Sequence, residues 1–153
     1  MRLLDRASIP YDVVTYDVDE NDLSGIHVAH QIGMDADAVF KTLVLQGERT
    51  GHLVCCLPVS CELDLKKVAR ASGDKRVEMI PMKTLFEVTG YIRGGCSPLG
   101  MKKEFPTYID ESALLFERIG VSAGVRGEQI LCNPDALITL IGACTADLIR
   151  TDL

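Results

Sequence analysis

The chain has 153 residues, of which 47% are hydrophobic and 25% are charged, and its formal net charge is −6 at pH 7. This composition excludes a disordered tail, a collagen-like rod and a low-complexity array. The length fits one domain, and we expect residues 1–153 to form it. No apolar run approaches the roughly 20 residues of a membrane span, and charges and Pro10 interrupt the N-terminus before a signal-peptide core could form. The sequence therefore predicts a soluble cytoplasmic protein with no membrane partner.

The first 33 residues predict two helices separated by a strand and an acidic loop. Residues 2–7 indicate a short helix that ends before Pro10, and the β-branched and aromatic residues at 11–16 indicate a strand. Residues 17–22 are the acidic loop. Ser24 is a helix-capping residue type, and we expect the helix that it begins to end at Gly33.

The rest of the chain alternates short strands with short helices. The predicted elements are strands at 40–45 and 52–57 joined by a glycine-containing hairpin loop at 46–51, an amphipathic helix at 63–71, a strand at 76–80, a helix opened by Pro81, irregular glycine-rich chain at 90–100, strands at 107–110, 117–122 and 129–132, and a last helix at 135–141 capped by Asn133. The irregular strand spacing and the hairpin argue against a doubly wound parallel sheet. The predicted fold class is α/β (α+β), with a mixed, largely antiparallel sheet curled into a barrel-like shape and helices around it.

Lys41 is the most informative side chain of the sequence. In the strand predicted at 40–45, alternation places Lys41 on the same face as Leu43 and Leu45. An ammonium group on an apolar face is costly to bury unless it is paired or meets an anionic ligand. Lys41 is therefore a candidate cation for a carboxyl, phosphate or ester oxygen. The alternative is a lysine at the mouth of the strand that extends to water.

Two turns rich in small residues supply further candidate contacts. Residues 94–100 contain three glycines, which let the backbone approach a ligand closely, together with the hydroxyl of Ser97. Their spacing fits neither a Walker A loop nor a dinucleotide-binding turn. Residues 122–127 form a second such turn after a strand and expose the hydroxyl of Ser122. Each stretch is also explained, taken alone, as a tight structural turn.

The sequence does not identify an enzyme nucleophile or a metal site. There is no G-x-S-x-G elbow, and no Ser–His–Asp or Cys–His arrangement stands out. Cys96 lies in the glycine-rich loop and leaves a cysteine hydrolase open, although no basic partner is near it in sequence. The six cysteines and three histidines lack the paired spacing of metal ligands, so we expect no metal, no disulfide framework and no cofactor.

Charge is distributed unevenly along the chain. Residues 66–103 hold nine basic and three acidic residues, a net charge of +6. Because the whole chain has a net charge of −6, the remaining residues carry a net charge of −12. An acidic protein is a poor non-specific binder of DNA or RNA, because phosphate neutralisation supplies most of that affinity. The basic segment is either a set of solvated helix and loop faces or the surface that meets a nucleic acid.

Four motifs, taken in order, resemble one family. They are F-K-T-L at 40–43, T-G-Y at 89–91, G-G-x-S-P-L-G at 94–100 and V-S-x-G-x-R-G at 121–127. Their order and spacing resemble the YbaK-type Cys-tRNA(Pro) deacylases, free-standing relatives of the editing insertion domain of bacterial prolyl-tRNA synthetases. The likeness runs from Tyr16 to Ile149. It implies a barrel-like mixed sheet and a hydrolase that cleaves the ester between a wrong amino acid and the 3′-terminal adenosine of tRNA.

The resemblance also implies roles for individual residues. Lys41 is implied as the catalytic cation beside the ester or the terminal ribose and phosphate. The implied substrate-binding residues are Tyr16, Thr42, Gly94, Gly95 and Ser122, to which the glycine-rich loop adds Ser97. In the family's mechanism the thiol of the substrate attacks the ester carbonyl and releases a cysteine thiolactone. That mechanism would account for the missing enzyme nucleophile.

The chain departs from the family pattern at three positions. Gln129 stands where some members carry an Asp, and Ala123 and Val125 replace an expected glycine and base. These changes leave the implied role of Lys41 intact but leave the preferred amino acid open. The expected partners are mischarged tRNA, bound by its 3′ aminoacyl-adenosine end, and a prolyl-tRNA synthetase, with the basic segment facing the acceptor stem. The alternatives are a deacylase for Ala-tRNA(Pro) or another misacylated tRNA, and a non-catalytic module that binds tRNA or a nucleotide.

Overall fold

The computed structural model describes residues 1–151 and contains short helices and strands throughout. The helices, including two 3₁₀ turns, are α1 (Arg2–Arg6), α2 (Gly25–Ile32), α3 (Leu65–Ser72), η1 (Met82–Thr84), α4 (Leu85–Thr89), η2 (Glu111–Leu115) and α5 (Pro134–Ile141). The strands are β1 (Tyr11–Thr15), β2 (Phe40–Gly47), β3 (Gly51–Pro58), β4 (Val77–Met79), β5 (Thr107–Asp110), β6 (Ile119–Ser122), β7 (Glu128–Cys132) and β8 (Cys144–Ala146).

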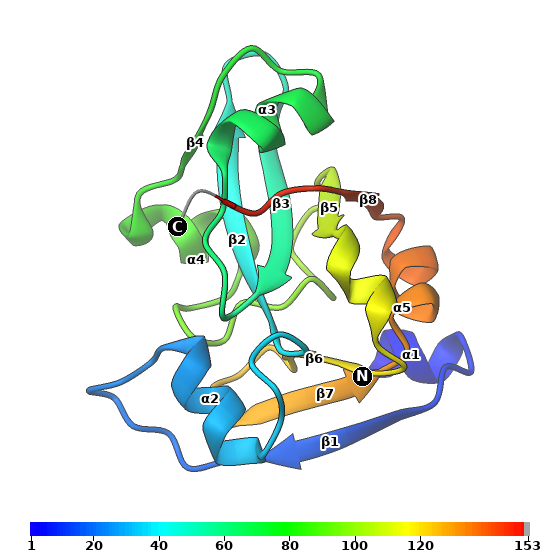
Figure 1. The fold of residues 1–153 in the computed structure, drawn as a ribbon. Coiled ribbons are helices and arrows are strands. Elements are labelled where there is room, and N and C mark those ends of the chain that lie inside the picture. Colours follow the sequence, from blue (N-terminus) through cyan, green and yellow to red (C-terminus); the bar gives the residue numbers. More distant parts are fainter. Residues whose placement is uncertain (152–153) are drawn as a thin grey trace.

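The strands form two sheets, and the barrel-like closure expected from the sequence is wrong. The smaller sheet has the order β1-β7-β6 and is antiparallel throughout. The larger has the order β4-β2-β3-β5-β8; its first three strands are antiparallel, and β5 and β8 join in parallel. Figure 1 shows the tall β2–β3 hairpin with the smaller sheet lying across its lower end. The two sheets meet at one bridge, between Val39 and Gly120.

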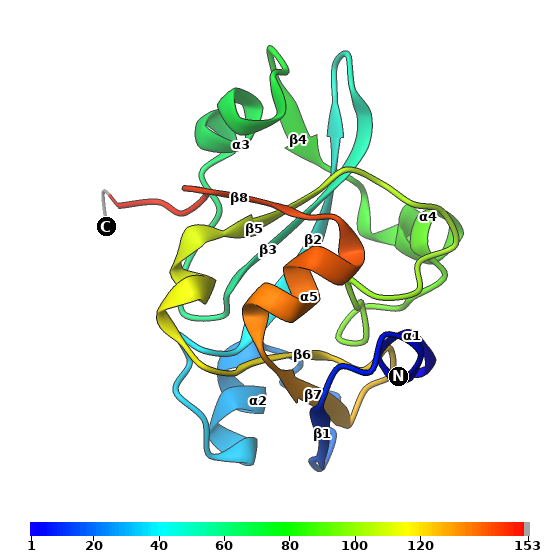
Figure 2. The same cartoon turned by 90° about the vertical axis from the view of Figure 1, so that its right-hand side faces the viewer.

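The two faces of the β2–β3 hairpin pack into different clusters. Phe40 and Val44 belong to the larger cluster, which also takes buried residues of β6, β7 and α5. Leu43 and Leu45 lie on the other face and pack with α3 and β4. Figure 2 shows α5 in front of the region between the two sheets, and α3 beside the upper end of the hairpin. The alternation predicted for this strand is thus confirmed by burial on both faces.

Local capping explains where most helices begin and end. The Ser24 hydroxyl accepts a hydrogen bond from the His27 N–H, and Gly33 ends α2 with a φ of +70°, as predicted. Asn133 caps α5 in the same way. The predicted start of α3 is wrong by two residues, because Asp64 accepts hydrogen bonds from the backbone of residues 66 and 67 and so becomes the cap.

Two short elements differ from the sequence prediction. Pro81 precedes a 3₁₀ turn, η1, before α4 begins, rather than opening an α-helix directly. Strand β8 was not predicted, and its first two residues are exposed. Within residues 1–151, no helix is long and apolar enough to cross a lipid bilayer.

Candidate functional site

The candidate site is a cavity of about 410 Å³ beside the lower half of β2. Strand β4 pairs with β2 only at residues 45–47, and β6 meets it only through the bridge at Val39. Residues 40–44 of β2 therefore have an edge that no strand covers among residues 1–151. The cavity occupies this gap, closed by the start of α2 on one side and by η1 and α4 on the other.

The uncovered edge offers backbone hydrogen-bonding groups to the cavity. The Val39 carbonyl accepts from Val59 on β3, whereas the Val44 carbonyl accepts from Ile80 on the opposite side. Because successive residues of a strand point in opposite directions, the N–H and C=O of Thr42 also point away from β3. Thr42 has no strand partner on that side among the described residues. Its backbone is thus available to a ligand. The Thr42 hydroxyl oxygen lies 3.7 Å from the sulfur of the neighbouring Cys56.

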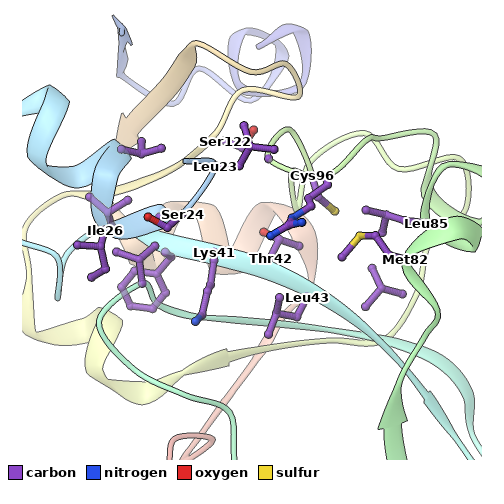
Figure 3. A pocket seen from close by; sticks show the side chains of 18 of the residues that line it. Leu23, Ser24, Ile26, Lys41, Thr42, Leu43, Met82, Leu85, Cys96 and Ser122 are labelled. Atoms are coloured by element: carbon purple, nitrogen blue, oxygen red, sulfur yellow. The ribbon is translucent and has the colours of Figure 1, made fainter. Parts of the chain in front are cut away.

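Lys41 lines the same cavity from the other face of β2. Its side chain is half-buried, and burial lowers the pKa of the ammonium group, while Cys61 and Glu62 act in the opposite direction. No carboxylate within residues 1–151 lies within 4 Å of its nitrogen. In Figure 3 the Lys41 nitrogen points away from Ser122 and Cys96. A ligand that contacts both Lys41 and Ser122 must therefore lie along the edge of the strand.

Ser122 and Gly94 line the cavity opposite this edge, as the sequence predicted for a shared site. The Ser122 oxygen accepts a hydrogen bond from the Gly124 N–H at 3.1 Å, which leaves its hydroxyl hydrogen free to be donated. Gly94 has a φ of +83°, and an added Cβ would come within 3.3 Å of the Arg126 Nε. That Nε donates to the Arg93 carbonyl at 2.7 Å and ties the glycine-rich loop to the β6–β7 turn.

Three residues predicted for the site do not line this cavity. Gly95 is buried, and its backbone packs against the β6–β7 turn, where an added Cβ would lie 3.4 Å from Val125. Ser97 is 1% exposed, and its hydroxyl oxygen accepts from the Leu99 N–H. Tyr16 lines a small adjoining cavity, which shares Gly94 with the larger one. Substrate contact by these three residues stays a prediction.

Cys96 lines the cavity, but its sulfur is a poor nucleophile. Burial raises the pKa of the thiol to about 11, with a hydrogen bond from Thr89 acting against burial. At neutral pH the side chain is therefore almost wholly the protonated thiol. None of the residues that line the cavity is an Asp, a Glu or a His. Lys41 and Arg93 are its charged groups.

The structure adds Gln129 to the site, a residue that the sequence singled out only as a departure from the family. Gln129 is opposite Ser122 in the β6–β7 pair, is 5% exposed and lines the cavity. Its side-chain oxygen is buried without a hydrogen-bond partner among the described residues. Such an orphaned acceptor is uncommon in folded proteins and is often a functional group. Periodicity could not have shown this, because the missing partner depends on three strands packing together.

Comparison with known proteins places the chain in a family. Residues 25–140 match the family model for the aminoacyl-tRNA editing domain. The chain is 47% identical to EbsC of Enterococcus faecalis over 97% of this chain and 90% of the relative, whose name gives its activity provisionally as a Cys-tRNA(Pro)/Cys-tRNA(Cys) deacylase. It is also 28% identical to the uncharacterized protein YwhH of Bacillus subtilis over 71% of this chain and 69% of that protein.

Solved structures agree with this assignment. A crystal structure described provisionally as a trans-editing enzyme for prolyl tRNA synthetase superposes with a TM-score of 0.81 at 26% identity, covering 92% of this chain and 87% of that one. The hypothetical protein APE2540 shares the fold, with a TM-score of 0.88 at 17% identity over 97% of both chains. The resemblance stated from the four sequence motifs is thus confirmed: the chain belongs to the aminoacyl-tRNA editing domain family.

Proposed function

We propose that this protein is an aminoacyl-tRNA deacylase that removes cysteine from mischarged Cys-tRNA(Pro) in trans. Membership of the editing-domain family and the 47% identity to EbsC support a hydrolase that acts on the aminoacyl-tRNA ester. A cavity of about 410 Å³ is of the size that holds a small-molecule ligand, and here the ligand is the aminoacylated terminal adenosine. Aminoacyl-tRNA is a cytoplasmic substrate, so we expect the protein to act there.

The observation that carries the proposal is a cavity with a cation but no activated nucleophile. Lys41 faces it without a carboxylate partner among the described residues, and Cys96 is held as a neutral thiol. The Ser122 hydroxyl has no His or carboxylate beside it in the lining to serve as a general base. An ester that reaches this cavity must therefore be attacked by water or by a group of its own. Cysteine supplies such a group, whereas alanine does not.

In this reaction the protein positions and polarises, and the substrate reacts with itself. The substrate thiol loses its proton, its sulfur forms a bond to the ester carbonyl carbon, and the bond from that carbon to the ribose 3′ oxygen breaks. The ribose oxygen takes up a proton, and the cysteine leaves as a thiolactone that water then opens. Lys41 stabilises the negative charge that develops on oxygen, and Ser122 and the Thr42 backbone hold the aminoacyl group.

The tRNA body and a synthetase complete the proposed assembly. A net charge of −6 supplies little long-range attraction for tRNA, so delivery by prolyl-tRNA synthetase would raise the local substrate concentration. The crystal structure described for prolyl tRNA synthetase trans-editing supports this partner. The name of EbsC adds Cys-tRNA(Cys), and discrimination between the two cysteine esters would then fall to the synthetase.

Deacylation assays with the Lys41→Ala variant test the proposal. The wild-type protein is given Cys-tRNA(Pro) and Ala-tRNA(Pro), and the remaining ester is followed with time. We expect rapid loss of the cysteinyl ester only, and a loss of kcat/KM of at least about a hundredfold in Lys41→Ala, within the range of a removed transition-state contact. Lys66→Ala on α3 is the matched control and should behave as the wild type.

Other results lead to different conclusions. Preferential hydrolysis of the alanyl ester would be compatible with the proposed site but would exclude attack by a thiol of the substrate. Equal rates for the wild type and Lys41→Ala would remove Lys41 from catalysis. No turnover of either ester, with tRNA binding retained, would make the protein a binding module.

A further inference from the structure

The mouth of the cavity has two rims of opposite charge. Residues 16–24, which lead into α2, contain four acidic residues and no basic one, a net charge of −4. Residues 81–103, which run from Pro81 just before η1 to Lys103 just after the glycine-rich loop, contain four basic residues and one acidic residue, Glu87, a net charge of +3. Leu23 and Ser24 line the cavity from the first segment, and Met82, Leu85 and Arg93 line it from the second. Figure 1 shows α2 and α4 on the same side of the molecule, with α4 above α2, and both helices contribute residues to the cavity lining.

The basic rim also exposes large apolar side chains. Met82 and Phe86 are 57% and 59% exposed. The Lys102 ammonium group lies 5.2 Å from the centre of the Phe86 ring. We call Met82, Lys83, Phe86, Arg93 and Lys102 the α4 rim. An accessible aromatic ring beside several cations is the combination with which proteins hold single-stranded nucleic acid, because a base stacks on the ring and the cations contact the phosphates.

The size of the cavity requires such a path. About 410 Å³ accommodates the aminoacylated terminal adenosine, so the nucleotides before it must leave through the mouth. Each carries a negative phosphate. The acidic rim at Asp17, Asp19, Glu20 and Asp22 repels them, and the α4 rim attracts them. The basic residues of α3, which also belong to the segment 66–103, lie at the far end of the β2–β3 hairpin (Figure 1).

We propose that the α4 rim holds the single-stranded 3′ end of tRNA, with one base stacked on Phe86 and the phosphates beside Lys83, Arg93 and Lys102. This inference rests on the proposed function for the identity of the nucleic acid. From the sequence we expected the whole basic segment, the 38 residues 66–103, to face the tRNA. The proposal assigns this contact to the α4 rim alone and leaves out the part of α3 that belongs to the same segment. Phe86 and Lys83 do not line the cavity, so they act on the strand rather than on the ester.

A comparison of two substrates distinguishes the contribution of the α4 rim from that of the cavity where the ester reacts. The first is Cys-tRNA(Pro), and the second is cysteinyl-adenosine, which keeps the ester and the terminal nucleoside but lacks the preceding nucleotides. For Phe86→Ala we expect KM for Cys-tRNA(Pro) to rise about tenfold, the size of one lost base stack, with kinetics on cysteinyl-adenosine unchanged. Phe86→Tyr keeps the ring and should restore KM. Leu115→Ala, which truncates a side chain 81% exposed on η2, is the control for loss of exposed apolar surface.

A binding measurement keeps the rim testable if the ester chemistry fails. Fluorescence anisotropy compares an uncharged acceptor-stem RNA hairpin with its single-stranded 3′ end and the same hairpin made blunt. We expect the wild type to prefer the overhang, Phe86→Ala to lose this preference, and Lys83→Ala to flatten the salt dependence of log K by about 0.7. Lys66→Ala should leave that slope unchanged.

The outcomes distinguish the two proposals. If Phe86→Ala raised KM equally for Cys-tRNA(Pro) and for cysteinyl-adenosine, the proposed role of the α4 rim would be wrong, because Phe86 would then shape the cavity. Equal binding of the blunt and overhanging hairpins would also overturn it and would turn attention to a protein partner. The wild type could also cleave neither ester but still bind the overhanging hairpin more tightly, with that preference lost in Phe86→Ala. This result would support the α4 rim and exclude the proposed function.

Discussion

Gln129 lies opposite Ser122 in the β6–β7 pair and is a buried amide in the wall of the cavity. It stands where some members of the family carry an Asp, and its side-chain oxygen has no hydrogen-bond partner among the described residues. A neutral amide adds no negative charge to a cavity whose charged groups are Lys41 and Arg93. It also keeps an acceptor for a polar group of the aminoacyl moiety. We therefore expect Gln129 to serve the substrate rather than the fold.

The Gln129→Met variant tests this assignment, because Met has nearly the same length and no hydrogen-bonding amide. Replacing a buried unsatisfied acceptor by an apolar group costs little stability, so the Tm should stay the same or rise. The kcat/KM for Cys-tRNA(Pro) should fall by about tenfold, which corresponds to one lost hydrogen bond of about 1.4 kcal/mol. A clear drop in Tm with full activity would instead make Gln129 a structural residue.

At the scale of elements, Asp74 fixes the end of the hairpin that carries Lys41. Its carboxylate is 9% exposed and accepts hydrogen bonds from the backbone of Arg49 and Thr50, from the Thr50 hydroxyl, and from the backbone of residues 75 and 76. One side chain thus joins the β2–β3 turn to the chain that leads from α3 to β4. Gly47 leaves the room for it, since an added Cβ would lie 2.1 Å from the carboxylate.

This arrangement predicts acid sensitivity. Burial raises the pKa of Asp74, but the hydrogen bonds from Thr50, Arg76 and Arg49 outweigh burial and hold the pKa well below its ordinary value of 3.8. A carboxylate with a lowered pKa contributes stability at neutral pH, and that contribution is lost as the pH falls below about 4. In Asp74→Asn we expect a lower Tm at pH 7 and a smaller further loss toward pH 3 than in the wild type.

Thermal unfolding as a function of pH checks this expectation. Asp17→Asn, on the exposed acidic loop, is the control and should follow the wild-type curve. Parallel curves for the wild type and Asp74→Asn would contradict the role of this carboxylate.

The elements show how much of the fold the sequence could predict. Caps depend on a few adjacent residues, so both ends of α2 and the cap of α5 were predicted correctly. The face of β2 that carries Lys41 followed from alternation alone. The separation into two sheets could not be predicted, because it depends on β1 pairing with β7, far along the chain. The short parallel strand β8 has exposed residues and carries no hydrophobic signal.

At the scale of the whole molecule, the site exists because the two sheets do not close. The family motifs predicted that Lys41, Thr42, Gly94 and Ser122 share a site, and they line one cavity. Alternation already placed Lys41 and Thr42 on opposite faces of this strand, but the sequence could not predict that β4 and β6 leave the edge between them uncovered. A single domain over residues 1–153 and a role for Tyr16, Gly95 and Ser97 stay predictions.

The same architecture is consistent with the proposed reaction, which needs no nucleophile from the protein. The uncovered edge supplies backbone donors and acceptors, Lys41 supplies charge, and no base stands beside Cys96 or Ser122 in the lining. In the proposed reaction these groups would hold and polarise the ester, and they would not attack it. We therefore expect the attacking atom to be the sulfur of the substrate.

The most direct test compares Cys-tRNA(Pro) with the same tRNA carrying S-methylcysteine, whose sulfur cannot form the thiolactone. Cleavage of both esters by the wild type and by Cys96→Ser is measured under single-turnover conditions. We expect both proteins to cleave the cysteinyl ester at similar rates, and the S-methyl ester to react at least about a hundredfold more slowly. Cleavage of the S-methyl ester at the cysteinyl rate, or loss of all activity in Cys96→Ser, would contradict this expectation.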